Sequence, residues 1–229
     1  MCSKKFDREK LLINKSQFNK INNSKIAVFG IGGVGGYVCE MFARAGVKTL
    51  LLCDFDKVDE TNINRQIIAY ENSVGNFKVD EMEKRLKSIN SSIEIIKVVD
   101  AVSENNIDKF NLSTFDYVVD AIDDIPNKLV LIEHCKQNNI NIISSMGAGN
   151  KVCIPNYIVT DIFKTKYDKL ARIIRQKCRE KGIKKLDVCY METDKIISNG
   201  EKVIGSISYH PCVCGAVISS FVINKLINI

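Results

Sequence analysis

A glycine-rich segment near the start of the chain limits the possible folds more than any other feature. It reads Gly30-Ile31-Gly32-Gly33-Val34-Gly35, the pattern GxGxxG. Residues 25–29 before it are typical of a strand, and residues 33–45 have the spacing of a helix. Glycines let the backbone turn sharply and approach phosphate oxygens, while the helix N-terminus offers free N–H groups. The segment therefore predicts a phosphate-binding site in an α/β domain.

The rest of the chain alternates short β-rich runs with helical runs. Strands are expected at 25–29, 49–53, 93–99, 117–121 and 141–145, and helices at 33–45, 76–89 and 126–138. This alternation predicts a Rossmann-like, mostly parallel sheet with helices on both faces. Ligands of such sheets bind beyond the carboxyl ends of the strands.

The alternation becomes less regular after Gly149. We expect strands at 157–162 and 187–191, helices at 167–181 and 211–226, and a polar loop at 193–202. The length of 229 residues suits one sizeable core. The predicted organisation is a single domain, with a nucleotide-binding core in residues 1–150 and a C-terminal elaboration in residues 151–229 that binds substrate.

Composition favours a reduced, cytoplasmic protein that does not enter a membrane. The nine cysteines are an odd number, lie mostly in apolar runs and include no CxxC pair. We interpret Cys212 and Cys214 as buried thiols at the start of a helix. The N-terminus is charged, and no apolar run reaches the roughly 18 residues of a membrane span. The formal net charge of +6 is weak support for an anionic partner.

Asp54 ends the second predicted strand, where a nucleotide-binding site of this kind places an acidic residue on the ribose hydroxyls. The glycine pattern with Asp54 does not by itself distinguish NAD from ATP. Two basic residues, Arg65 and Lys78, follow it. Cations beside the phosphates suit cleavage of a triphosphate, in which negative charge builds up, better than hydride transfer. Asp123, after the fourth strand, could hold Mg²⁺. Each residue alone has a structural explanation as a surface ion-pair partner or a helix cap.

Four segments, GIGGVGG, DFDKVDETNINRQ, FKVDEM and VVDAIDD, resemble the ubiquitin-activating-enzyme-like superfamily over about residues 6–150. The resemblance implies an enzyme that uses ATP and Mg²⁺ to adenylylate a carboxylate, with Asp123 on the metal. It also implies a homodimer in which Arg8, in Phe6-Asp7-Arg8, reaches the ATP of the partner. The residues expected to bind ATP are Gly30, Gly32, Gly33, Gly35, Asp54, Asp56, Asn62, Arg65, Gln66 and Lys78; those expected to act in catalysis are Arg65, Lys78, Asp123 and Arg8.

Further segments are most similar to the tRNA threonylcarbamoyladenosine dehydratases. They are SSMGAGNK at 144–151, DIFKT at 161–165, LAR at 170–172 and GSIS at 205–208. This similarity implies ATP-dependent dehydration of N6-threonylcarbamoyladenosine in tRNA. The substrate carboxylate would be adenylylated, and the modification would then cyclise and release AMP. A sulfur-relay protein is a possible further partner.

Residues 164–185 are rich in Lys and Arg. At helical spacing Lys169, Arg172, Arg175 and Arg179 fall near one face, while Tyr167, Leu170, Ile173, Ile174 and Cys178 could face the core. A basic helix is often only a solvated surface. It could instead bind the tRNA backbone through its phosphates, which is the interpretation we prefer.

Three other functions stay open at this point. A sulfur-carrier or ubiquitin-like protein adenylyltransferase would share the ATP residues, although such enzymes often carry two CxxC pairs. An idle tRNA-binding module would not need the set of Arg65, Lys78 and Asp123. An NAD oxidoreductase would need a hydride-transfer site, and none is identifiable in the sequence.

Overall fold

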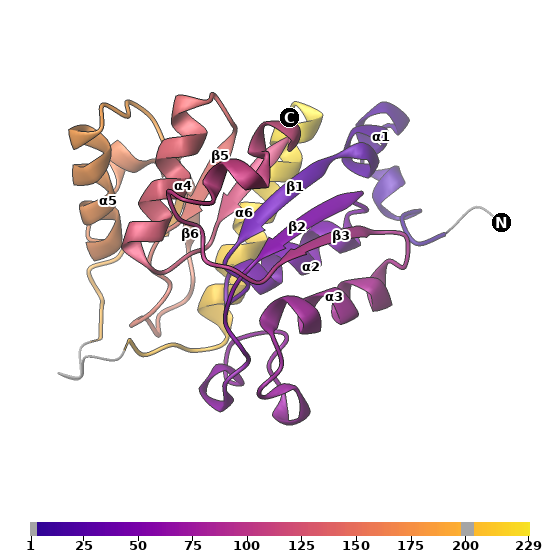
Figure 1. Cartoon of the computed structure of the whole chain (residues 1–229), viewed down its shortest axis with the longest axis horizontal. Helices are drawn as coiled ribbons and strands as arrows, with labels where there is room; N and C mark the ends of the chain where they lie inside the picture. Colours follow the sequence, from indigo (N-terminus) through magenta and orange to yellow (C-terminus); the bar gives the residue numbers. More distant parts are fainter. Residues whose placement is uncertain (1–3, 198–203) are drawn as a thin grey trace.

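A seven-stranded sheet forms the centre of the chain (Figure 1), seen here in a computed structural model that describes residues 4–197 and 204–229. The strand order is β3-β2-β1-β4-β5-β7-β6, and β6 alone runs antiparallel to its neighbour. This is the Rossmann-like, mostly parallel α/β sheet that the sequence predicts. The strands are β1 (Lys25–Phe29), β2 (Thr49–Cys53), β3 (Glu94–Val98), β4 (Tyr117–Asp120), β5 (Ile142–Ser145), β6 (Tyr157–Asp161) and β7 (Asp187–Met191).

Helices cover both faces of the sheet, as predicted. The α-helices are α1 (Lys15–Asn23), α2 (Gly35–Arg44), α3 (Lys78–Ile89), α4 (Ile125–Gln137), α5 (Lys169–Glu180) and α6 (Tyr209–Ile227). Short 3₁₀ helices lie at η1 (Glu9–Leu11), η2 (Glu60–Asn62), η3 (Glu71–Ser73), η4 (Ile107–Phe110), η5 (Leu112–Thr114) and η6 (Ile162–Lys164). Helices α1, α2, α3 and α6 contribute to one apolar core, and α4 and α5 to the other. Each core is built from alternate strand residues, such as Val28 on one face and Phe29 on the other.

The predicted strands and helices are present, with ends that differ by a few residues. Helix α1 is an addition, and Asn14 and Gln17 close a capping box at its start. The predicted polar loop at 193–202 falls partly on residues 198–203, which lie outside the described residues. In the C-terminal part, β7 pairs with β5 and β6 pairs with β7. Residues 151–229 therefore extend the same sheet.

Helix α6 has the length and apolar composition of a membrane span, and its buried side chains pack into the apolar core. Cys214, Ile218 and Val222 on this helix are fully buried beside the sheet. A Cβ on Gly215 would lie 2.9 Å from the Tyr37 Cβ and from the Val34 carbonyl oxygen. Glycine at this position lets α6 lie close against α2.

The strand order places a crevice between β1 and β4. From β1 the chain continues to β2 and β3 on one side, and it then returns to β4 on the other side. The connection after β1 leads to β2 and the connection after β4 leads to β5, in opposite directions along the sheet, and ligands of open α/β sheets bind at such a point. The glycine segment follows β1, so the fold brings it to this crevice.

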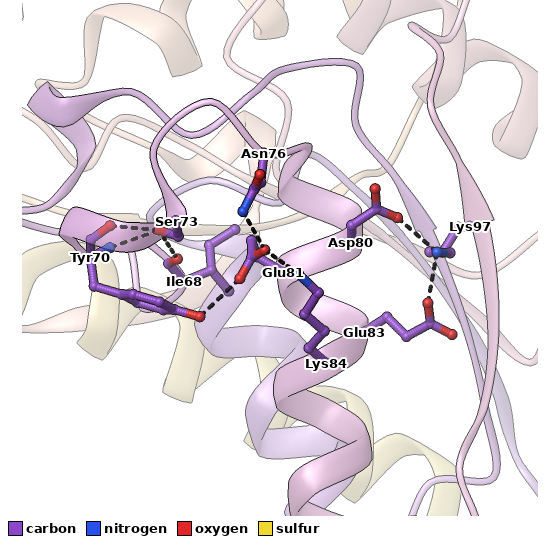
Figure 2. A network of polar contacts seen from close by, with 9 residues as sticks. All are labelled: Ile68, Tyr70, Ser73, Asn76, Asp80, Glu81, Glu83, Lys84 and Lys97. Carbon is purple, nitrogen blue, oxygen red and sulfur yellow. Dashed lines mark hydrogen bonds and ion pairs between the residues drawn. The ribbon is translucent and has the colours of Figure 1, made fainter.

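A buried carboxylate on α3 ties the long loop between β2 and α3 to that helix (Figure 2). Glu81 accepts hydrogen bonds from the Tyr70 hydroxyl (2.8 Å), the Asn76 amide (2.9 Å) and the Lys84 ammonium (2.7 Å). Burial alone would raise the pKa of Glu81, but the bonds from these three partners outweigh it and lower the pKa. The loop that carries Arg65 is thus anchored to the helix that begins at Lys78.

Replacing Glu81 with Ala should lower the free energy of unfolding by about 2–3 kcal/mol, because three hydrogen bonds to one buried carboxylate are lost. Glu83→Ala is a matched control on the same helix. The ion pair of Glu83 with Lys97 (2.7 Å) is partly exposed, and such pairs contribute less than about 1 kcal/mol. Urea denaturation followed by circular dichroism measures both changes. Equal losses in the two variants would show that the Glu81 network does not anchor the loop.

Candidate functional site

A cavity of about 560 Å³ opens at the carboxyl edge of the sheet, beside β1 and β4. This volume is within the range of small-molecule sites. One part of its lining comes from the glycine segment and the ends of β2 and β4. The opposite part comes from residues 145–151, at the end of β5 and directly after it, and from the start of α5. The cavity therefore joins the predicted nucleotide site to the C-terminal part of the chain.

The glycine segment needs glycine for two different reasons. Gly30 has φ +85°, and a Cβ there would lie 2.6 Å from the Ala121 carbonyl oxygen, so a side chain would be both strained and blocked. Gly30, Gly32 and Gly33 line the cavity. A Cβ on Gly35 would lie only 1.8 Å from the Gly30 carbonyl oxygen. Gly35 thus serves the close packing of α2 on the segment, and the first three glycines form the cavity wall.

Asp54 is a buried carboxylate that holds the glycine segment in place. One oxygen accepts a hydrogen bond from the Ile31 amide at 2.6 Å, and the other accepts one from the Asp56 amide at 2.8 Å. Burial raises the pKa of Asp54, although Lys78 and the two amide bonds act in the opposite direction. The side chain also lines the cavity, where its remaining lone pairs could accept from hydroxyls.

Lys78 is buried at the first position of α3, and its ammonium lies 2.6 Å from the Asp56 carboxylate. Its backbone amide also donates to the Asp56 carbonyl at 3.0 Å. Both side chains line the cavity, and about half of the Asp56 side chain is exposed. The pair places a fixed cation beside the glycine segment, with a carboxylate that can turn away toward solvent.

The loop after β2 brings Arg65 and Gln66 to the cavity, but not Asn62. The guanidinium of half-buried Arg65 donates to the Thr61 carbonyl at 2.6 Å. Gln66 is buried, and its side-chain oxygen has no hydrogen-bond partner among the described residues. This oxygen could accept a hydrogen bond from a bound ligand. The Asn62 side chain accepts from the Asp59 amide at 3.1 Å and completes the capping box of η2, whose N-cap is Asp59. Asn62 positions the loop in this conformation.

The acidic residues at the end of β4 and directly after it have three different surroundings. Asp120 is fully buried and accepts from the Ser144 hydroxyl at 2.5 Å, with the Lys128 ammonium at 2.9 Å. Burial raises the pKa of Asp120, and Lys128 acts against that rise. Helix α4 is capped by Asp124, so the alternative explanation of Asp123 as a helix cap is wrong. Asp123 is exposed and lines the cavity.

Lys128 is a residue that the sequence analysis missed. It is fully buried, and its ammonium also donates to the Ile122 carbonyl at 2.7 Å. A lysine within an otherwise ordinary helix gives no sign of burial. Among residues 4–197 and 204–229, no group of three or more His, Cys, Asp or Glu could hold a metal. A cation at Asp123 would therefore need ligands from a bound phosphate.

The basic residues of α5 have different surroundings. Lys169 is exposed at the edge of the cavity and Arg172 is exposed outside it. Arg175 donates to the Thr165 carbonyl and hydroxyl at 2.8 and 2.6 Å, so it fastens the loop before the helix. Arg179 lies over the Phe163 ring, 5.7 Å from its centroid. Lys169 and Arg172 are therefore the least constrained cations of the predicted set.

The prediction of the apolar face of α5 was partly wrong. Ile174 and Cys178 are buried as expected, but Tyr167 is 63% exposed and precedes the helix. Leu170 and Ile173 line the cavity. The helix begins two residues later than predicted because Asp168 caps it, accepting from the Ala171 amide at 2.8 Å.

Arg8 lies away from the cavity of its own chain. Its segment is anchored by Phe6, whose ring packs on Phe18 with centroids 5.6 Å apart and approaches Gly46. Gly46 precedes β2, so this contact is at the amino edge of the sheet, opposite the cavity. Arg8 is exposed. Any contact with a nucleotide would have to be made in another subunit.

The cysteines of the described residues are free thiols. Cys214 is buried, with its sulfur 3.6 Å from the Cys189 sulfur and 3.5 Å from the Ser145 hydroxyl, whereas Cys212 is half-buried. The expectation of buried thiols at the start of a helix is thus right for Cys214 and only partly right for Cys212.

Known proteins resemble this chain in sequence and in overall fold. The tRNA threonylcarbamoyladenosine dehydratase of Bacillus subtilis is 40% identical over 84% of this chain and 76% of its own length. The protein of that name from Escherichia coli is 37% identical over 69% of this chain, which spans 59% of the relative. The solved structure of E. coli tRNA N6-threonylcarbamoyladenosine dehydratase in complex with ATP is 29% identical, with a TM-score of 0.91 over 98% of this chain and 94% of that one. The ThiF family model matches residues 6–229, and this chain belongs to the ThiF family.

Proposed function

We propose that this chain is an ATP-dependent tRNA threonylcarbamoyladenosine dehydratase. The observation that carries the proposal is the cavity at the β1–β4 crevice, where a glycine segment faces Arg65 and Lys78. Cations fixed beside phosphates lower the energy of the charge that develops when a triphosphate is cleaved. The B. subtilis and E. coli relatives supply the substrate, because both carry the name of this activity.

The chemistry requires a carboxylate to become an electrophile. A carboxylate oxygen of the threonylcarbamoyl group would attack the α-phosphorus of ATP, forming a mixed anhydride while pyrophosphate leaves. A nitrogen or oxygen of the same modification would then attack the carbonyl carbon, closing a ring, and AMP would leave with the carboxylate oxygen. The net change is loss of one water from the nucleoside. Positioning and charge neutralisation suffice, without a covalent enzyme intermediate.

Different residues of the cavity would bind different parts of the nucleotide. The amides near Gly30, Gly32 and Gly33 would face phosphate oxygens, and Asp54 would accept from the ribose hydroxyls. The Lys78 ammonium would contact a phosphate oxygen, and its ion pair with Asp56 would either break or persist beside that contact. Asp123 would hold Mg²⁺, which neutralises phosphate charge when bound. Gln66 offers its unpaired oxygen to a donor on the nucleotide.

The proposal also includes tRNA as partner, a homodimer and a cytoplasmic location. Arg8 supports the dimer, because its segment lies at the opposite edge of the sheet from the cavity. Helix α5 supports RNA binding, because its exposed cations begin at the cavity edge. A sulfur-relay protein stays a prediction from sequence resemblance.

Exchange of labelled pyrophosphate into ATP tests the first chemical step. It should require RNA that carries threonylcarbamoyladenosine, and Asp123→Ala should slow it by about a hundredfold while the protein stays folded. Asp108→Ala, at an exposed carboxylate on η4, is the control. Exchange supported by a sulfur-carrier protein instead of RNA would favour the alternative adenylyltransferase. Tight NAD binding without ATP binding, measured by calorimetry, would contradict both.

Subunit mixing tests the role of Arg8. Arg8→Ala and Asp54→Ala should each be nearly inactive as homodimers, because every site would lack Arg8 in the first variant and Asp54 in the second. Purified mixed dimers should recover up to about half of wild-type activity, since one of the two sites in each mixed dimer is intact. Differently tagged subunits, purified as mixed dimers, provide the sample. Mixed dimers with no recovered activity would show that each chain supplies its own site.

Charge reversal on α5 tests the RNA surface. Arg172→Glu should weaken tRNA binding and reduce the slope of log affinity against log salt by about one, because a phosphate contact is lost. Affinity for ATP should stay unchanged. Lys109→Glu, an equal charge change at an exposed residue of η4, is the control. If the two variants bind tRNA equally over a salt series, Arg172 belongs to a solvated surface.

A further inference from the structure

The cavity continues beyond the part assigned to ATP. Its far wall is formed by Met146, Leu170 and Ile173, together with the ionisable residues Lys151 and Asp168. Arg65 and Lys78 belong to the opposite, nucleotide part. The far wall is therefore mostly apolar and contains a charged pair for which the binding of ATP gives no use.

Lys151 is a buried cation whose ammonium has more hydrogen-bond donors than it has acceptors among the described residues. It is 5% exposed, and within the described residues its ammonium donates one hydrogen bond, to the Gly147 carbonyl at 2.5 Å. Its closest carboxylate oxygen, on Asp168, is 3.9 Å away, beyond hydrogen-bond distance. The other Asp168 oxygen caps α5 through the Ala171 amide. An ammonium has three donors, so Lys151 can make a further strong bond on the cavity side.

The surroundings of Lys151 favour an anionic partner. Burial lowers the pKa of Lys151, while Asp168 acts against this and helps to keep the side chain charged. A buried ammonium with incomplete hydrogen bonding is costly to maintain, and an anion in the cavity would remove that cost. Apolar neighbours such as Met146 and Ile173 would strengthen the attraction by excluding water.

The proposed reaction brings such an anion to this wall. Its nucleophile is a carboxylate that must approach a polyanionic phosphate chain, and the two repel each other. A fixed cation on the side away from the nucleotide would offset the repulsion and orient one carboxylate oxygen toward phosphorus. After adenylylation the acyl group has no negative charge, so this attraction would weaken before ring closure.

We infer that Lys151, held by Gly147 and Asp168, binds the carboxylate of the threonylcarbamoyl group and positions it for adenylylation. This inference rests on the proposed function. It adds a residue that recognises the acyl group, separate from the cations assigned to ATP and to the tRNA backbone.

The test compares two RNA stem-loops that differ in one charge. One carries threonylcarbamoyladenosine, and the other carries its methyl ester. Binding to the full chain is measured with a non-hydrolysable ATP analogue present. The wild type should bind the acid about tenfold more tightly than the ester, as expected for a hydrogen bond to a charged group. In Lys151→Met this preference should disappear, mainly through weaker binding of the acid. Lys151→Arg should keep much of the preference.

Lys25→Met is the control, because Lys25 is exposed at the amino end of β1, across the sheet from the cavity. If Lys151→Met does not fold, Lys151→Gln removes the charge with a polar side chain of similar length. If Lys151 is purely structural, its substitution would weaken binding of both RNAs equally and leave the ratio of the two affinities unchanged, which would overturn the inference. A wild type without any acid preference would also overturn it, while failure to bind either RNA would instead refute the proposed function.

Discussion

The close backbone approach at Gly30 is the constraint on which the site depends. There the loop after β1 touches the loop after β4, with only 2.6 Å between a hypothetical Cβ and the Ala121 carbonyl oxygen. Gly35 then lets α2 begin directly against the same turn. Without these contacts the helix N-terminus would stand away from the crevice, and the backbone amides could not converge on one ligand. Glycine at two positions thus converts a strand–helix turn into one wall of a cavity.

Two buried carboxylates fix this arrangement, whereas an exposed one has no such structural contact with the described residues. Asp54 ties the end of β2 to the glycine segment, and Asp120 ties the end of β4 to β5 and to Lys128 on α4. Both are desolvated and hydrogen-bonded, so they rigidify the crevice. Asp123, by contrast, is exposed at the same edge. The segment from Asp120 to Asp123 therefore contributes one carboxylate to the fold and one to the proposed metal site.

Much of the fold could be predicted because its signals are local. Alternating runs gave the strands, and the spacing of the glycines gave the crevice at β1. Arg65 and Lys78 could also be assigned to one site from the sequence, because the motif that contains them is specific. Non-local relations were harder: nothing local shows that Lys128 is buried beneath Asp120, since the ion pair forms between separate elements.

The same limit applies to the C-terminal part. Helical spacing grouped Arg175 with Arg172, but Arg175 is occupied by Thr165 in a preceding loop whose path the spacing does not reveal. Lys151 stood in a segment noted only for its resemblance, and its meeting with Asp168 depends on how α5 docks against the end of β5. Residues that define one edge of the sheet were accessible to sequence reasoning, whereas contacts between the two parts required the structure.

The central claim is that the cavity activates a tRNA-borne carboxylate at the expense of ATP. The most direct measurement is mass spectrometry of nucleosides from threonylcarbamoylated tRNA incubated with the protein, ATP and Mg²⁺. The account predicts that the modified adenosine loses the mass of one water, with AMP and pyrophosphate formed in equal amount. Unchanged threonylcarbamoyladenosine, in a sample where the protein is folded and binds ATP, would contradict the account.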